Sequence, residues 1–148
     1  MENKVQSPAL IMRSMKYAFV VSGILFVYIG FKVMAPPRHE ASQPIQIAFA
    51  SVGLVCIAGG FLVPGLLFRP VQGAAQNVPV TTQLQRWMVK SIMSLAYFEA
   101  SILFGLVLHM LGGSNRIVGL LMGAGIAAEL IWSPGPPPGA QSGEFPQG

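Results

Sequence analysis

Four long runs of apolar residues, separated by polar stretches, make up most of the chain. A run of about 20 apolar residues is long enough for an α-helix to cross the hydrocarbon core of a bilayer. The pattern therefore predicts an all-α fold, a four-helix transmembrane bundle made of two antiparallel hairpins. The predicted helices cover residues 17–35, 45–68, 91–111 and 117–132.

Prolines and glycines mark the breaks between these runs. Pro36-Pro37 ends the first run and Arg69-Pro70 ends the second. Only residues 112–116 separate the third run from the fourth, so these two helices should pack as a tight hairpin. The first run also has the basic start of a cleavable signal peptide, but no small-x-small cleavage site follows it, which favours a retained helix.

The fourth run is the shortest, with 16 residues. A helix of that length measures about 24 Å, whereas the hydrocarbon core is about 30 Å thick. We expect the helix to begin one turn earlier or the bilayer to thin around it; a re-entrant or interfacial segment is the alternative. Outside the membrane domain, residues 17–132, we expect a basic N-terminal segment over 1–16 and a disordered, Pro/Gly-rich tail over 133–148.

Composition strengthens the assignment to a membrane. Hydrophobic residues make up 53% of the chain and charged residues only 9%, where a soluble domain has roughly 25% charged residues. This excludes an ordinary soluble enzyme and also a disordered chain, which needs high charge. The net charge is +4, but the cations lie at the ends of the apolar runs and form no patch for nucleic acid. The expected partner is the lipid bilayer.

The cations also predict an orientation, because loops on the cytoplasmic side carry the excess of Lys and Arg. Both termini and the central loop should therefore be cytoplasmic, in a multi-pass protein of the cell membrane, either plasma or bacterial inner. Six cations favour that side: Lys4, Arg13, Lys16, Arg69, Arg86 and Lys90. Three lie on the other: Lys32, Arg38 and Arg116.

Glu99 is the most informative single residue. It follows Lys90 by nine residues, which places it about 13 Å into the third helix. An ionised carboxylate at that depth costs at least ~2.5 kcal/mol, so the group needs a proton, a partner or water. Two interpretations follow: a reversible proton or cation site, or a neutral carboxyl that bonds another helix and fixes packing.

The segment MSLAYFEASILFGLVLHML around Glu99 resembles the carboxylate helix of rotary ATP synthase proteolipids, the c subunits. Those helices carry a single acid among small residues, followed by a glycine and an aliphatic run. The corresponding positions here are Ala96, Glu99, Ala100 and Gly105. The resemblance is confined to this helix, and it implies that Glu99 is the carboxylate that carries the ion.

The other polar residues of the runs give weaker signals. Glu129 lies three residues before Trp132, so we expect it to reach the interface and be solvated. His109 lies near the end of the third helix, about 15 Å along the axis from Glu99, too far to share a metal ion. Cys56 stands alone. The sequence therefore predicts no catalytic residue, no metal site and no cofactor.

Small residues recur at helical spacing in the third and fourth runs. Such small-xxx-small patterns allow close approach of two backbones in lipid. We predict that Ser101 and Gly105 of the third helix pack against Gly119 and Gly123 of the fourth.

These observations favour a structural or accessory membrane protein that packs against other membrane subunits or its own copies, and not an enzyme. The alternative is a proteolipid-like component that translocates protons or cations through Glu99. Polar groups at the depth of Glu99 on other helices would favour the alternative. The sequence offers only Ser22 or Tyr28 in the first helix and Cys56 in the second, and this scarcity favours the structural role.

Overall fold

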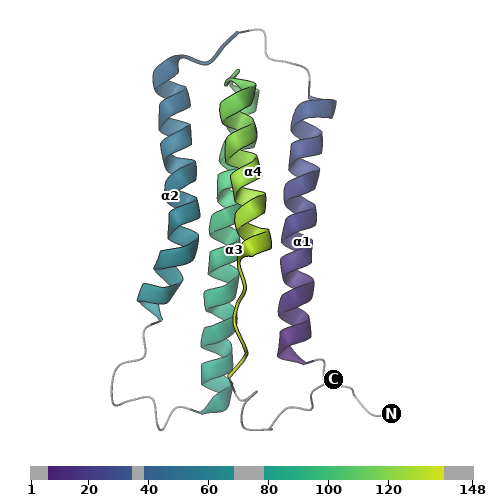
Figure 1. Cartoon of the computed structure of the whole chain (residues 1–148), viewed down its shortest axis with the longest axis vertical. Coiled ribbons are helices and arrows are strands. Elements are labelled where there is room, and N and C mark those ends of the chain that lie inside the picture. The colour runs from purple at the N-terminus through teal and green to yellow at the C-terminus, as the bar shows by residue number, and fades with distance from the viewer. Residues whose placement is uncertain (1–6, 35–38, 69–78, 139–148) are drawn as a thin grey trace.

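The computed structural model describes residues 7–34, 39–68 and 79–138, and this part of the chain contains helices and no strand (Figure 1). The predicted all-α fold with four helices is confirmed. The helices are α1 (Pro8–Tyr28), continued by the π-helical η1 (Ile29–Val33), α2 (Gln43–Leu67), α3 (Val80–Met110) and α4 (Asn115–Ile131). Three of them, α1 with η1, α2 and α3, are long and apolar enough to cross a membrane.

Local signals fix where the helices begin. Ser7 caps α1, since its hydroxyl accepts a hydrogen bond from the backbone N–H of Leu10 at 3.4 Å, and Ser114 caps α4 in the same way. The α1 and α3 helices begin at Pro8 and Val80 rather than at residues 17 and 91, because polar residues next to an apolar run can continue its backbone hydrogen bonds.

The α3 and α4 helices form a tightly packed antiparallel hairpin, as predicted. The turn between them needs Gly112, whose φ of 86° is a conformation that side chains disfavour. The α1 and α2 helices also run antiparallel (Figure 1), but they lie on opposite sides of the hairpin. Among the described residues, each packs on α3 and α4 and not on the other.

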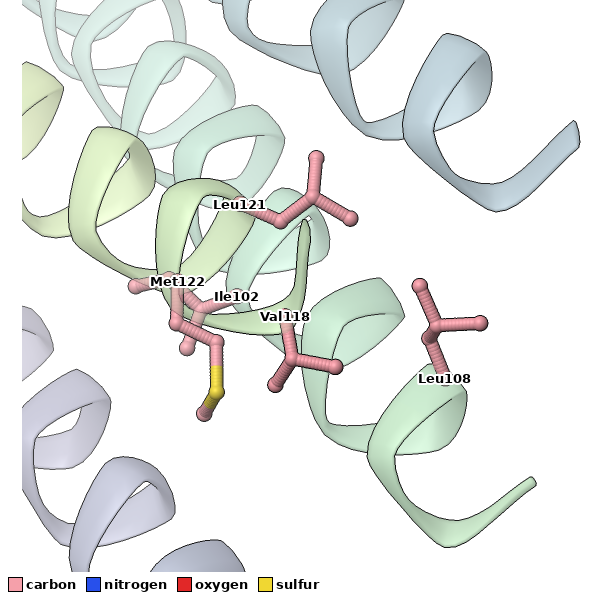
Figure 2. Close-up of a cluster of buried hydrophobic side chains, with 5 residues drawn as sticks. All are labelled: Ile102, Leu108, Val118, Leu121 and Met122. Atoms are coloured by element: carbon pink, nitrogen blue, oxygen red, sulfur yellow. The ribbon is translucent and has the colours of Figure 1, made fainter. Parts of the chain in front are cut away.

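The hydrophobic core lies inside this hairpin. Side chains of Ile102 and Leu108 from α3 meet Val118, Leu121 and Met122 from α4 (Figure 2). All five are at most 3% exposed, whereas the large side chains on the outer faces of α1 and α2 are mostly exposed. The core therefore joins two helices, and the other two helices are packed around it.

The fourth segment is helical for only part of the bundle's length. After Ile131 the chain is extended and descends beside the lower half of α3 (Figure 1). The ring of Trp132 lies 6.5 Å from that of Phe98, which is near the middle of α3. Trp132 therefore lies inside the bundle rather than at its end, and α4 is not among the helices long enough to span a membrane.

Two side chains hold this extended segment. The Lys16 ammonium donates to the carbonyls of Leu130 and Trp132, at 2.8 and 2.6 Å, and the Trp87 indole donates to the Pro134 carbonyl at 2.9 Å. The predicted tail, 133–148, thus begins with a stretch, 133–138, that is held against the helices. Residues 139–148 lie outside the described part, as do 1–6 of the predicted N-terminal segment.

The seam between α3 and α4 differs from the prediction on the α4 side. Ser101 and Gly105 do face α4: the Ser101 hydroxyl donates to the Leu121 carbonyl at 3.4 Å, and a Cβ on Gly105 would lie 2.5 Å from Met122. Gly119 and Gly123, however, are exposed, and a Cβ on either would meet nothing within 4 Å.

Gly125 takes their place in the seam. A Cβ added to it would lie 2.5 Å from the Ile102 side chain and 3.1 Å from the Phe98 carbonyl. The reason is the helical period: the buried residues of α4 are three or four apart, and Gly119 and Gly123 fall outside that stripe. The buried residues are Val118, Leu121, Met122, Gly125, Ala128 and Glu129.

Candidate functional site

Glu99 lies in the middle of α3 and points toward α1. The Ser22 hydroxyl of α1 donates a hydrogen bond of 2.7 Å to Oε1 of the Glu99 carboxyl. Oε2 of the same carboxyl is buried, and no backbone N–H, hydroxyl or side-chain N–H in the described part of the chain donates to it. Ser22, which the sequence offered as a polar group at this depth, is therefore a direct partner of Glu99.

Glu129 is the residue that the sequence interpretation misplaced. It was expected at the interface, but its side chain is 0% exposed. Two features explain the difference. Glu129 falls on the buried stripe of α4, four residues after Gly125, and α4 ends inside the bundle rather than at its edge.

The two carboxyl groups converge at the junction of α1, α3 and α4. The carboxyl of Glu129 is close enough to that of Glu99 to interact with it electrostatically. Gly23, next to Ser22, faces both α3 and α4: a Cβ there would lie 2.8 Å from Ile102 Cδ1 and 3.7 Å from Glu129 Oε2. The missing side chain of Gly23 therefore leaves room for the Glu129 carboxyl. We call Glu99, Glu129 and Ser22 the carboxyl pair site.

The site has more acceptor atoms than donors. Both oxygens of Glu129 and Oε2 of Glu99 are buried, and while both carboxyls are ionised no group among the described residues donates a hydrogen bond to them. A proton on either carboxyl allows the two to bond to each other. Two ionised carboxylates held together in an apolar interior repel each other and lose their hydration, so the doubly charged state is unfavourable. A proton on one carboxyl, or a cation between the two, removes that penalty. Reversible proton exchange is the chemistry that this arrangement allows.

The ammonium group of Lys16 binds the end of α4 that carries Glu129. Lys16 lies six residues before Ser22 on α1, about 9 Å along the helix. Its ammonium binds carbonyls at the C-terminus of α4, where a helix carries partial negative charge. This cation, which the sequence analysis counted only toward orientation, holds the helix end that carries Glu129.

The remaining candidates lie away from this site. Tyr28 is exposed, and Cys56 is half-buried on α2. His109 lies at the C-terminal end of α3 and is 7% exposed, with its imidazole 4.9 Å from the Phe31 ring. Within the described residues, no three His, Cys, Asp or Glu side chains are placed to hold a metal ion.

No protein-family model matches the chain, and the searches of curated proteins and solved structures found no significant similarity to it.

Proposed function

We propose that the chain is an integral membrane protein that takes up and releases a proton at the carboxyl pair site, as a proton- or cation-translocating component. The observation that carries this proposal is the convergence of two buried carboxyls from different helices. Glu99 comes from α3 and Glu129 from α4, and the described residues provide one hydrogen-bond donor, Ser22, for the pair.

Three further points support this function. The sequence argument for a structural role rested on a scarcity of polar groups at the depth of Glu99, and Glu129 now adds one there. Among the described residues, the three remaining oxygens have no donor except the neighbouring carboxyl, so a proton shared between Glu99 and Glu129 is what completes their hydrogen bonding. The local resemblance of α3 to the carboxylate helix of ATP synthase proteolipids also gives Glu99 an ion-carrying role.

The proposed location is the cell membrane, plasma or bacterial inner, with both termini in the cytoplasm. The three long apolar helices support a membrane location, and the distribution of cations supports the orientation. The extended segment also ends at the end of the bundle where α1 begins (Figure 1). That arrangement suits an even number of crossings.

A second candidate function is a structural or accessory subunit. It is favoured by Gly119 and Gly123, which leave a smooth exposed strip on α4 with nothing within 4 Å of either position. Small residues on an exposed membrane helix permit close approach of another helix, either from another subunit or from a second copy of this chain. The two functions are compatible, because proteolipid-like components act within assemblies.

The experiment is proton uptake into proteoliposomes under an imposed membrane potential, read with an internal pH dye. We expect the purified chain to support uptake, and Glu99→Gln and Glu129→Gln to reduce it at least tenfold, because each removes an ionisable carboxyl but keeps its size. Glu40→Gln, which changes an exposed carboxyl, is the matched control and should leave uptake unchanged. Equal uptake by wild type and both site variants, all folded, would contradict proton exchange and leave the accessory role.

A further inference from the structure

The carboxyl pair site is enclosed differently toward the two ends of the bundle. Glu129 lies fourteen residues after Asn115, the first residue of α4, but only two residues before Ile131, the last. The α4 helix therefore continues for about 21 Å from Glu129 toward the α3–α4 turn, and for about 3 Å toward the end of the bundle where α1 begins. This helix shields the site in one direction only.

Toward the α3–α4 turn, the hydrophobic core separates the site from water. Five side chains that are at most 3% exposed lie along the chain between the carboxyls and the turn: Ile102, Leu108, Val118, Leu121 and Met122. The Ser101 hydroxyl in the same region already donates to the Leu121 carbonyl at 3.4 Å. Because both backbones are helical there, their N–H and C=O groups bond to each other and do not bind water.

In the other direction the chain leaves the helix directly after the site. The extended segment over residues 132–138 runs beside α3 toward the end of the bundle where α1 begins (Figure 1). Ser133 and Gly135 are exposed, and nothing in the described part of the chain accepts a hydrogen bond from their backbone N–H groups. Lipid cannot bond such groups, so non-helical backbone at membrane depth occurs only inside protein or beside water. Water therefore reaches this segment.

Lys16 extends this hydrated region to the residue next to Glu129. Its ammonium donates to the carbonyl of Leu130, which follows Glu129 in the chain, at 2.8 Å, and to that of Trp132 at 2.6 Å. An ammonium has three N–H donors, and the third has no acceptor among the described residues. The Lys16 side chain is only half-buried, so water is the partner that remains for this N–H.

The other charged groups of the packed helices are distant from the pair. The α2 helix contains no charged residue, and its one titratable side chain, Cys56, is half-buried. Tyr97, close to Glu99 in the chain, faces Gly59 of α2. The remaining cations and the histidine are at least nine residues, or about 13 Å along a helix, from Ser22, Glu99 or Glu129: Arg13, Lys32, Arg86, Lys90, His109 and Arg116.

We propose that, in this conformation, the carboxyl pair site exchanges its proton with water on the side of the membrane where α1 begins, past the end of α4, and is closed to the other side by the hydrophobic core. This inference rests on the proposed function, since it names the route to that site. On release, the O–H bond of a carboxyl breaks and the proton passes to water, which leaves a carboxylate. With the orientation proposed above, this side is the cytoplasm.

The test follows the carboxyl C=O infrared band of the pair in vesicles while the pH is changed on one side only. A titration of the full chain in detergent, where both ends meet water, first gives an alkaline pH at which the band is lost. Vesicles with the N-terminus outside are then separated, through an N-terminal affinity tag, from those with it inside. We expect an external change to that pH to remove the band in the first population and leave it unchanged in the second over the same time.

A chemical block tests the position of the route. In a Cys56→Ala background, Ser133→Cys places a thiol on the exposed extended segment, and Asn115→Cys places one at the exposed start of α4 as the matched control. Both thiols are modified with a bulky maleimide in detergent before reconstitution. We expect the modified Ser133→Cys chain with its N-terminus outside to lose the fast response to external pH, and the modified Asn115→Cys chain to keep it.

The outcomes separate the route from the function. A band that does not titrate in detergent would contradict the proposed proton exchange, and the route with it. A band that titrates in detergent but responds equally in both vesicle populations, or only with the N-terminus inside, would overturn the route and leave the proposed function standing. A fast response that survives modification of Ser133→Cys would show that the proton does not pass the end of α4.

Discussion

The α3–α4 hairpin and the two flanking helices are built differently. Nine residues of α3 and six of α4 are buried, whereas α1, with 21 residues, and α2, with 25 residues, bury only three each. In the hairpin, large apolar side chains pack against one another. In the flanking helices, half of the buried residues are glycines: Gly23 in α1, and Gly53 and Gly60 in α2.

These glycines receive large side chains of the hairpin. A Cβ would lie 2.8 Å from Ile102 at Gly23, 2.7 Å from Leu121 at Gly53 and 2.4 Å from Phe98 at Gly60. At these interfaces the hairpin contributes the large side chains, and the glycines of the flanking helices leave room for them. We infer from this comparison that packing inside the hairpin contributes most of the free energy of folding. The contribution of α1 is to complete the carboxyl pair site by placing Ser22 against Glu99.

The largest expected effect comes from filling the hairpin seam. Gly125→Leu puts a side chain where even a Cβ would lie 2.5 Å from Ile102, so the two helices must separate. We expect a loss of about 3 kcal/mol or more, measured as a lower unfolding temperature in detergent. Gly123→Leu is the matched control on the exposed side of α4. The structure predicts little change for it, and a large loss there with none at Gly125 would reverse the assignment of the seam.

The next effect concerns the docking of α2. Gly60→Ala introduces a Cβ that would lie 2.4 Å from the buried ring of Phe98, and the ring cannot move without disturbing the hairpin. The expected cost is about 1–3 kcal/mol of unfolding free energy. Gly65→Ala, in the same helix but with nothing within 4 Å, should be neutral or stabilise by about 0.5–1 kcal/mol. Equal destabilisation by the two variants would mean that α2 does not pack on Phe98.

The smallest effect concerns the extended segment after α4. Trp87→Phe keeps an aromatic side chain but removes the indole N–H that donates to the Pro134 carbonyl. One such hydrogen bond contributes about 0.5–1.5 kcal/mol, so overall stability should fall only slightly. Cleavage by a protease after the α4 helix should become faster, as measured by mass spectrometry. An unchanged cleavage rate would show that Trp87 does not hold this segment.

The sequence could predict the helices because a run of apolar residues is a local signal. It could predict Glu99 as well, since a charge inside such a run is conspicuous. It could not predict the depth of Glu129 in the bundle, because that depth depends on where α4 ends relative to α3. Distance from Trp132 suggested the interface, yet the stripe of buried residues in α4 was present in the sequence and would have favoured both Glu129 and Gly125.

For a similar reason, the predicted first residues of α1 and α3 lie too far along the chain. Hydropathy reports the part of a helix that suits lipid, and α1 and α3 extend beyond it. The role of Lys16 was also beyond the sequence, because the carbonyls that it binds, those of Leu130 and Trp132, lie more than a hundred residues away in the chain.

The most direct test of the account is the protonation state of the carboxyl pair site at pH 7, measured by infrared spectroscopy of the carboxyl C=O stretch in a lipid bilayer. We expect a band from a buried, protonated carboxyl in the wild-type chain. The double variant Glu99→Gln/Glu129→Gln should lose it, and Glu40→Gln should keep it. A wild-type chain without this band at pH 7, or a double variant that retains it, would contradict the claim that Glu99 and Glu129 form a proton-binding pair.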